Sequence, residues 1–214
     1  MRKVFGWVLL FLMSTIVSFG QKAKPVFEVV PLGVYGGIDE RNLSAYLVAP
    51  IGTKEYVCLD AGTVHSGIEK AIEKGTFSVP SSTVLRQYIK GYCISHAHLD
   101  HVSGLIINSP ADSTKTVYAI APAMKMMQNH YFNDQTWANF GDEGLGKPLK
   151  KYHFETLSFG KTIPISNTSM TVQAFPLSHV NPYESTAFLI KKGNNAVLYL
   201  GDTGPDAVEK TTNL

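Results

Sequence analysis

The sequence predicts an α/β (α+β) protein in which two mixed β-sheets pack on each other and helices cover the outside. Two observations favour this class. Strand-like segments gather near both ends of the chain with helical segments between them, which suits a layered arrangement. The part after position 20 is also long enough for one domain with a sizeable core. No internal repeat, low-complexity segment or linker divides it, so we expect a single domain over 21–214.

The first twenty residues have the pattern of a secretory signal peptide. Arg2 and Lys3 precede the apolar run 4–19, and small residues, Ser18 and Gly20, occupy positions −3 and −1 of a cleavage site. The run is shorter than the roughly 20 apolar residues of a membrane helix, and no cysteine follows it to indicate a lipoprotein. We therefore expect an exported protein, periplasmic or secreted, with a signal peptide at 1–20 and no stable membrane anchor.

The expected mature domain is formally neutral. Without Arg2 and Lys3, 17 of the 19 basic residues remain, against 17 acidic ones. A general nucleic-acid surface needs a basic excess gathered on one face, so none is indicated. The two cysteines, Cys58 and Cys93, lie in apolar strand-like segments, and a disulfide would demand a narrow geometry between such strands. We expect two buried free thiols.

The expected elements follow from the periodicity of apolar residues and from the Gly, Pro and Asn residues that separate the segments. Helices are predicted at 64–74, 82–90 and 122–131, the last with Pro122 in its first turn. Strands are predicted at 26–34, 43–49, 55–59, 92–94, 116–121, 152–157, 169–176, 185–191 and 196–200. A glycine-rich loop is predicted at 141–151.

The segment 94–110 contains three of the seven histidines. On an extended segment with a two-residue period, His96 and His98 fall on one face, about 6.6 Å apart. Asp100 and His101 follow where the chain turns from a strand into a short buried helix, and this change of direction can aim them at a second ion. Imidazole and carboxylate at this density suit Zn²⁺, with Mn²⁺ and Fe²⁺ as other borderline metals.

The run His96-Ala-His98-Leu-Asp100-His101 resembles the His-x-His-x-Asp-His signature of the metallo-β-lactamase superfamily. Its continuation to Pro110, with a small residue, an aliphatic triplet and a Ser-Pro ending, resembles the class II cyclic nucleotide phosphodiesterases. The resemblance implies a metallo-β-lactamase-like αββα sandwich with two divalent metal ions. It also implies hydrolysis of 3′,5′-cyclic nucleotides (cAMP or cGMP) to 5′-nucleotides.

The same resemblance implies the remaining ligands. His179, at the end of a strand, matches the third ligand of the first metal, and Asp202 matches the carboxylate that bridges both ions. The expected metal ligands are thus His96, His98, Asp100, His101, His179 and Asp202. Asp60 ends an apolar strand, where it is either a hydrogen-bond acceptor beside the metals or a turn residue that caps the following helix.

Residues 129–140, rich in aromatic and amide side chains, resemble two further elements of the family. An aromatic ring there can stack on a purine while an amide reads its edge, or the segment is a capping loop whose rings fill the core. Ser185 lies in a Ser-Thr-Ala-Phe element, where it either binds a phosphate oxygen or a metal ligand or simply packs in its strand. The candidate substrate-binding residues are His130, Asn133, Trp137, Asn139 and Ser185.

One feature departs from the family pattern, which has a further metal-binding histidine well beyond the bridging aspartate. This chain ends at Leu214, soon after Asp202. Either the second metal lacks a ligand or the chain lacks a C-terminal part, and we favour the second expectation because 206–211 has the pattern of the opening of a helix.

The expected mechanism is in-line attack of a metal-bound hydroxide on phosphorus, between ions about 3.5 to 4 Å apart. His96, His98 and Asp100 are the expected catalytic residues, and the leaving 3′ oxygen takes its proton from Asp100, a metal-bound water or the missing histidine. The alternatives are another hydrolase of this fold (lactonase, β-lactamase, thioesterase or RNA-processing type) or a non-catalytic metal-binding exported protein. The preferred nucleotide, the resident metal and the oligomeric state stay open.

Overall fold

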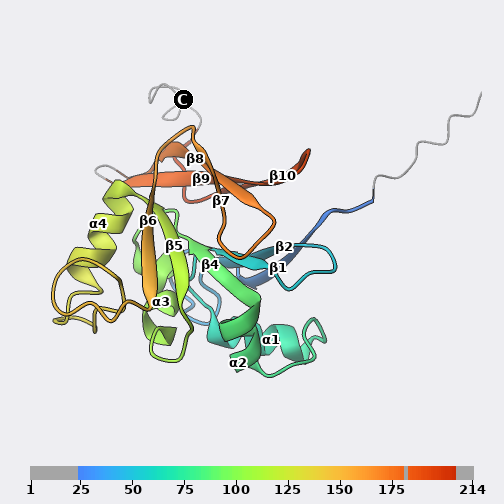
Figure 1. Ribbon diagram of the computed structural model, residues 1–214, viewed down its shortest axis with the longest axis horizontal. Coiled ribbons are helices and arrows are strands. Elements are labelled where there is room, and N and C mark those ends of the chain that lie inside the picture. The colour runs from blue at the N-terminus through green and yellow to red at the C-terminus, as the bar shows by residue number, and fades with distance from the viewer. Residues whose placement is uncertain (1–23, 181–182, 206–214) are drawn as a thin grey trace, which may run out of the picture.

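The computed structural model describes residues 24–180 and 183–205, so the expected signal peptide and the expected helix opening at 206–211 lie outside the described residues. Two β-sheets pack on each other (Figure 1). A six-stranded sheet has the order β1-β2-β3-β4-β5-β6, and a four-stranded sheet has the order β10-β9-β8-β7. The expected α/β class with two packed sheets is confirmed.

The strands are β1 (Phe27–Gly33), β2 (Ala45–Pro50), β3 (Tyr56–Leu59), β4 (Ile89–Cys93), β5 (Lys115–Ile120), β6 (Tyr152–Leu157), β7 (Thr162–Pro164), β8 (Thr171–Ser178), β9 (Glu184–Lys192) and β10 (Asn195–Leu200). The helices are α1 (His65–Glu73), α2 (Ser81–Thr83), the π-helix η1 (Val84–Tyr88), α3 (Leu99–Asn108) and α4 (Ala121–His130).

The strand directions bring several strand ends to common edges. β3, β4, β5 and β6 run parallel, and the helices form the crossovers between them. β8 and β10 are both antiparallel to β9, so they run in the same direction. The carboxyl ends of β3 and β4 therefore share one edge of the first sheet, and those of β8 and β10 share one edge of the second.

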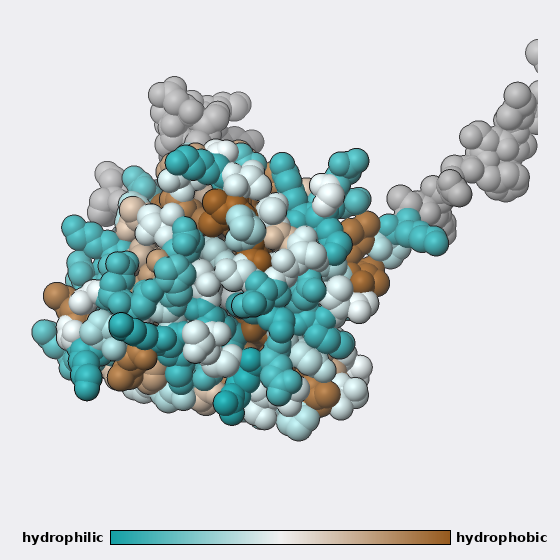
Figure 2. Space-filling view, in the orientation of Figure 1, coloured by the Kyte–Doolittle hydropathy of each residue, from teal (hydrophilic) through white to brown (hydrophobic). Residues whose placement is uncertain are grey.

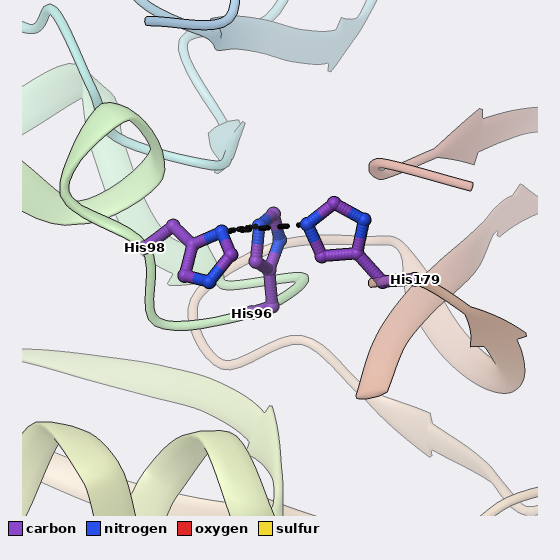
Figure 3. Close-up of side chains that lie close together, drawn as sticks. All are labelled: His96, His98 and His179. Carbon is purple, nitrogen blue, oxygen red and sulfur yellow. Dashed lines mark hydrogen bonds between the residues drawn. The ribbon is translucent and has the colours of Figure 1, made fainter. Parts of the chain in front are cut away.

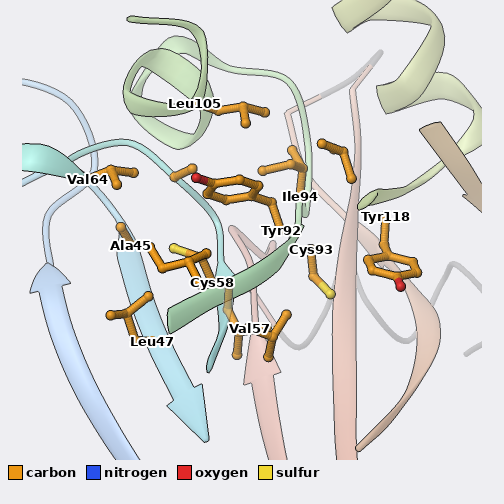
Figure 4. Packing of buried hydrophobic residues seen from close by; sticks show 14 of the residues in the cluster. Ala45, Leu47, Val57, Cys58, Val64, Tyr92, Cys93, Ile94, Leu105 and Tyr118 are labelled. Atoms are coloured by element: carbon orange, nitrogen blue, oxygen red, sulfur yellow. The ribbon is translucent and has the colours of Figure 1, made fainter. Parts of the chain in front are cut away.

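The core follows from this topology. Parallel strands that are covered on both faces have continuous apolar sequences. In agreement with this rule, β3 and β5 are buried at every position. Tyr92 and Leu105 lie among the buried side chains shown in Figure 4. Cys58 and Cys93 are buried and free, as expected.

Helices cover the face of the six-stranded sheet that points away from the four-stranded sheet (Figure 1). Within the described ranges, no helix covers the outer face of the four-stranded sheet, so the second helical layer of the expected sandwich is not formed by these residues. The face shown in Figure 2 has scattered apolar side chains separated by hydrophilic ones. Over the same ranges, every helix is too short or too polar to cross a membrane.

The helix predicted over 82–90 is wrong at its end. The helical turns stop at Tyr88, and Ile89 begins β4, where it pairs with Tyr56 and is 1 % exposed. Apolar residues at helical spacing in so short a segment also fit a buried strand, and the pairing with β3 decides between the two.

The structure also adds β7, a three-residue strand at the edge of the second sheet that no pattern predicted.

Candidate metal centre

The candidate ligands come from segments that directly follow strands. Asp60 follows β3, and His96 comes three residues after the end of β4. His179 follows β8, and Asp202 comes two residues after β10. Because these strand ends share edges of the two packed sheets, residues more than one hundred positions apart in the sequence meet at one place.

Three imidazoles form the first group: His96, His98 and His179 point toward one another (Figure 3). His96 Nε2 lies 3.1 Å from His98 Nδ1, and His179 Nε2 lies 3.4 Å from the same atom. The candidate ligand atoms of this group all lie within 4.8 Å of one another. A cation between them would accept the lone pairs of three neutral rings.

The second group contains His96, His101 and Asp202. Asp202 Oδ1 lies 3.3 Å from His101 Nε2, while its Oδ2 lies 3.8 Å from Nε2 of His179 in the first group. One carboxylate thus faces both groups, which is the arrangement expected of a bridging ligand. Asp100 lies at the margin, in the first turn of α3, with its Oδ2 3.7 Å from His101 Nε2 and accepting a hydrogen bond from Gly37 N.

One buried atom tests whether these residues fit a metal ion. His101 is 1 % exposed, and its Nε2 has no hydrogen-bond partner among the described residues, although Asp202 Oδ1 lies 3.3 Å away. A buried nitrogen left without a partner costs about 1–3 kcal/mol. A divalent cation ligated at this atom would remove the penalty, and imidazole with carboxylate is a donor set that borderline metals accept.

The buried carboxylate of Asp60 fixes the orientation of His101. It lies 2.7 Å from His101 Nδ1 and accepts hydrogen bonds from the Ser95 amide and hydroxyl and from the Tyr199 hydroxyl. Because Nδ1–H then donates to Asp60, Nε2 is the nitrogen left free for an ion. The N-cap of α1 is Val64, so Asp60 does not cap the following helix.

The electrostatics of the site separate its histidines. Burial, together with the neighbouring His101, lowers the pKa of His96 to about 4. Burial also acts against a charge on His101, but its contacts with Asp202 and Asp60 outweigh it and raise the pKa to about 10. The contact with His101 is in turn the main reason why the pKa of Asp202 falls to about 2. In the metal-free chain a proton therefore balances the carboxylates, and a bound cation would replace it.

Tyr131 of the predicted base-binding segment donates a hydrogen bond to the Ala97 carbonyl, between His96 and His98, but Trp137 of that segment lies away from the centre. Trp137 Nε1 donates to Ser109 Oγ at the C-terminal end of α3, whereas His98 and His101 lie at its N-terminal end. A ten-residue helix is about 15 Å long, so the two places are well separated. His130 is exposed at the last residue of α4.

The two amides of that loop are occupied by its own backbone. Asn139 is buried and donates to the carbonyls of Glu143 and Leu145. Asn133 Oδ1 accepts from the amides of Gln135 and Thr136. These contacts match the capping-loop alternative, and a role in substrate binding stays a prediction for His130, Asn133, Trp137 and Asn139.

Ser185 is buried behind the segment that carries Asp202. It is 0 % exposed on β9, and an added Cβ at Gly201 would lie 2.8 Å from its Oγ and 2.6 Å from Ser95 Cβ. The close approach therefore requires glycine before Asp202. Ser185 supports the placement of this segment, and contact with a substrate stays a prediction.

Three residues near the centre were not predicted as parts of the site. Ser95 and Tyr199 donate to Asp60, and the Tyr183 ring lies edge-on to His98 with centroids 4.5 Å apart. The one available signal was a tyrosine hydroxyl in the apolar run that leads to Asp202, because a buried hydroxyl needs a partner.

Comparison with known proteins supplies the family. The family model described as class-II cAMP phosphodiesterases matches residues 78–214. The chain is 43% identical over 206 residues to a protein of Yersinia pestis named probable 3′,5′-cyclic-nucleotide phosphodiesterase, covering 92% of this chain and 60% of that protein. It is 42% identical over 215 residues to the 3′,5′-cyclic-nucleotide phosphodiesterase of Aliivibrio fischeri, covering 95% and 64%. The chain thus spans less than two thirds of the length of these relatives.

Two solved structures support the fold. Unliganded yeast PDE1 superposes with a TM-score of 0.74 at 20% identity, over 85% of this chain and 66% of that one. The metallo-β-lactamase fold protein YhfI from Bacillus subtilis gives 0.59 at 17% identity, over 85% and 64%. The fold is therefore that of the metallo-β-lactamase proteins. The family model matches more than half of the chain, and the matched residues 78–214 include the histidine and aspartate cluster. The chain therefore belongs to the class II cAMP phosphodiesterase family.

Proposed function

We propose that the protein hydrolyses 3′,5′-cyclic nucleotides to 5′-nucleotides with two Zn²⁺ ions. The observation that carries this proposal is the position of Asp202, whose two oxygens face His101 and His179 in the two separate groups. The family and the names of the two relatives support the choice of a cyclic nucleotide. The abundance of imidazole supports Zn²⁺, with Mn²⁺ and Fe²⁺ as the other borderline metals.

The ligands divide between the two ions. His96, His98 and His179 would hold one ion, Asp100 and His101 the other, and Asp202 both. A pair of divalent ions supplies Lewis-acid stabilisation of a phosphoryl group and a water that ionises near neutral pH, so the protein need not provide a general base. The carboxylates of Asp100 and Asp202 would offset only part of the charge of two divalent ions, so the centre would stay positive and would suit a singly anionic phosphodiester.

The chain's own residues prepare this centre. Asp60 keeps a proton on His101 Nδ1 and thereby directs Nε2 to the ion. Ser95 links the backbone after β4 to the same carboxylate, and its hydroxyl lies 3.0 Å from His96 Nδ1. The Gly37 amide holds the Asp100 carboxylate at 2.9 Å. Side chains held in this way need little reorganisation when the reaction changes the charge at phosphorus.

The first test is hydrolysis of cAMP and cGMP by the purified protein loaded with Zn²⁺ or Mn²⁺. We expect 5′-nucleotide release that a chelator abolishes and that added metal restores, together with two metal ions per chain. Chromatography identifies the product, and elemental analysis counts the metal. Bound metal without turnover of either nucleotide would contradict the proposal and favour a metal-binding protein, whereas a 3′-nucleotide product would contradict the choice of leaving group.

We further propose that the protein is exported, on the basis of residues 1–20. Expression of the whole chain in a Gram-negative host should yield a periplasmic protein that begins at Gln21. Mass spectrometry of the osmotic-shock fraction measures this directly, and a deletion of 1–20 is the matched control, which should stay in the cytoplasm. An intact N-terminus on cytoplasmic protein would contradict export.

A further inference from the structure

A small cavity of about 210 Å³ opens directly beside the first histidine group. His96 and His98 form one side of it. The other lining residues include Pro122 and Met126 from the first turns of α4, together with Glu184 at the start of β9 and Tyr183 just before it. None of the predicted substrate-binding residues borders it.

The walls of this cavity suit a flat ring. Pro122 and Met126 contribute apolar surface, and Met adapts well to the face of an aromatic ligand. Tyr183 is 40% exposed, and its ring packs edge-on against His98 at 4.5 Å between centroids. A planar heterocycle can therefore stack on a tyrosine that contacts a candidate metal ligand.

The cavity also has a carboxylate, on the exposed side chain of Glu184. An ionised carboxylate only accepts hydrogen bonds and can take two parallel ones. Guanine presents two donors on one edge, N1–H and the N2 amine. Adenine presents one donor, the N6 amine, beside the N1 lone pair, which would face a carboxylate oxygen.

We propose that this cavity binds the nucleobase of the substrate, that Tyr183 stacks on the base, and that Glu184 selects guanine over adenine. The inference rests on the proposed function, because it assumes that the phosphate lies on the metal centre. The cavity shares His96 and His98 with that centre. A nucleotide whose phosphate lies on the metal centre can therefore extend its ribose and base into the cavity.

A second cavity competes for this role. It measures about 700 Å³ and lies between α3 and the loop that joins β1 to β2, but among the candidate ligands it borders only Asp100. Its lining includes Glu40 and His65 as well as apolar side chains. A base bound there would not contact Tyr183 or Glu184, so substitutions at these two positions discriminate between the cavities.

The test measures binding of 5′-GMP, 5′-AMP and ribose 5-phosphate to the Zn²⁺-loaded protein by calorimetry. Ribose 5-phosphate lacks the base and reports on the metal centre alone. In the unmodified protein we expect GMP to bind more tightly than AMP, and both more tightly than ribose 5-phosphate.

Substitution at each residue should give a different pattern. Glu184→Gln should weaken GMP about 10-fold and leave AMP unchanged or tighter, because an amide can pair with the adenine edge. Tyr183→Leu should weaken both nucleotides about 10-fold through lost stacking. Ribose 5-phosphate affinity and metal content should stay constant in both variants. The matched controls are Glu73→Gln on α1 and Phe159→Leu, both exposed positions outside the cavity.

Two results would overturn the inference: equal losses for GMP, AMP and ribose 5-phosphate, or no change in any of them. The kcat/KM ratio of cGMP to cAMP gives an independent readout and should fall about 10-fold in Glu184→Gln. Selective nucleotide binding without hydrolysis would contradict the proposed function and leave the base site intact. Hydrolysis that is insensitive to both substitutions would support the proposed function and contradict the base site.

Discussion

Replacing Asp202 by alanine is expected to lower kcat/KM for a cyclic nucleotide at least about 1000-fold, which corresponds to about 4 kcal/mol of transition-state stabilisation. Its Oδ1 lies 3.3 Å from His101 and its Oδ2 3.8 Å from His179, so in the proposed centre the change would remove one ligand from each ion. It would also remove a negative charge that lowers the repulsion between two cations. We therefore expect fewer than two bound metal ions per chain.

Metal analysis after dialysis and steady-state kinetics on the same sample measure both effects. Glu155→Ala is a matched control, because this half-buried carboxylate also contacts a histidine, His153 at 3.4 Å, but on β6, away from the centre. Asp202→Asn keeps the volume of the side chain and separates loss of charge from loss of packing, and circular dichroism verifies that both variants fold. Two tightly bound ions and full activity in Asp202→Ala would refute the bridging role.

The sequence was most informative where the site is local. His96, His98 and His101 lie within six positions, so spacing alone indicated a shared metal site. His179 and Asp202 are single residues at strand ends, a common place for such side chains, and only their order in the family pattern selected them. The structure brings them together because the carboxyl ends of the strands that carry them meet at shared edges.

The residues that the sequence did not reveal depend on contacts between the two sheets. Tyr199 donates to Asp60 across 139 positions of the chain, and no periodicity reports such a pairing. For the loop near Trp137, the aromatic and amide side chains allowed two alternatives, a base site and a capping loop. There the amides satisfy backbone groups of a segment without regular hydrogen bonding, a need that a sequence pattern cannot separate from ligand binding.

Replacing Asp60 by alanine is expected to lower both the stability of the fold and its affinity for metal. The carboxylate is fully buried and partners four groups: His101 Nδ1, the Ser95 amide and hydroxyl, and the Tyr199 hydroxyl. Without it these donors are buried and unpaired, so we expect a loss of about 3–5 kcal/mol in the free energy of unfolding. Because His101 then loses the partner that orients it, metal affinity should fall about 10- to 100-fold.

The backbone at this position adds a second cost that a control must separate. Asp60 has φ 53, a left-handed conformation that aspartate and asparagine tolerate better than alanine. Asp60→Asn keeps this preference and the side-chain volume, so its effect on metal affinity reports on the lost negative charge and the lost acceptor oxygen rather than on the backbone. Ser95→Ala and Tyr199→Phe each remove a single side-chain donor and should cost about 1–2 kcal/mol.

Urea unfolding of the metal-free protein and metal titration against a competing chelator distinguish the two roles of Asp60. A variant that unfolds more easily but binds metal with unchanged affinity would show that the network only stabilises the fold. Weaker metal binding in Asp60→Asn, with Tyr199→Phe unaffected, would instead trace the effect to His101. The buried carboxylate would then act on the reaction without touching substrate or metal, by deciding which nitrogen of one histidine carries the proton.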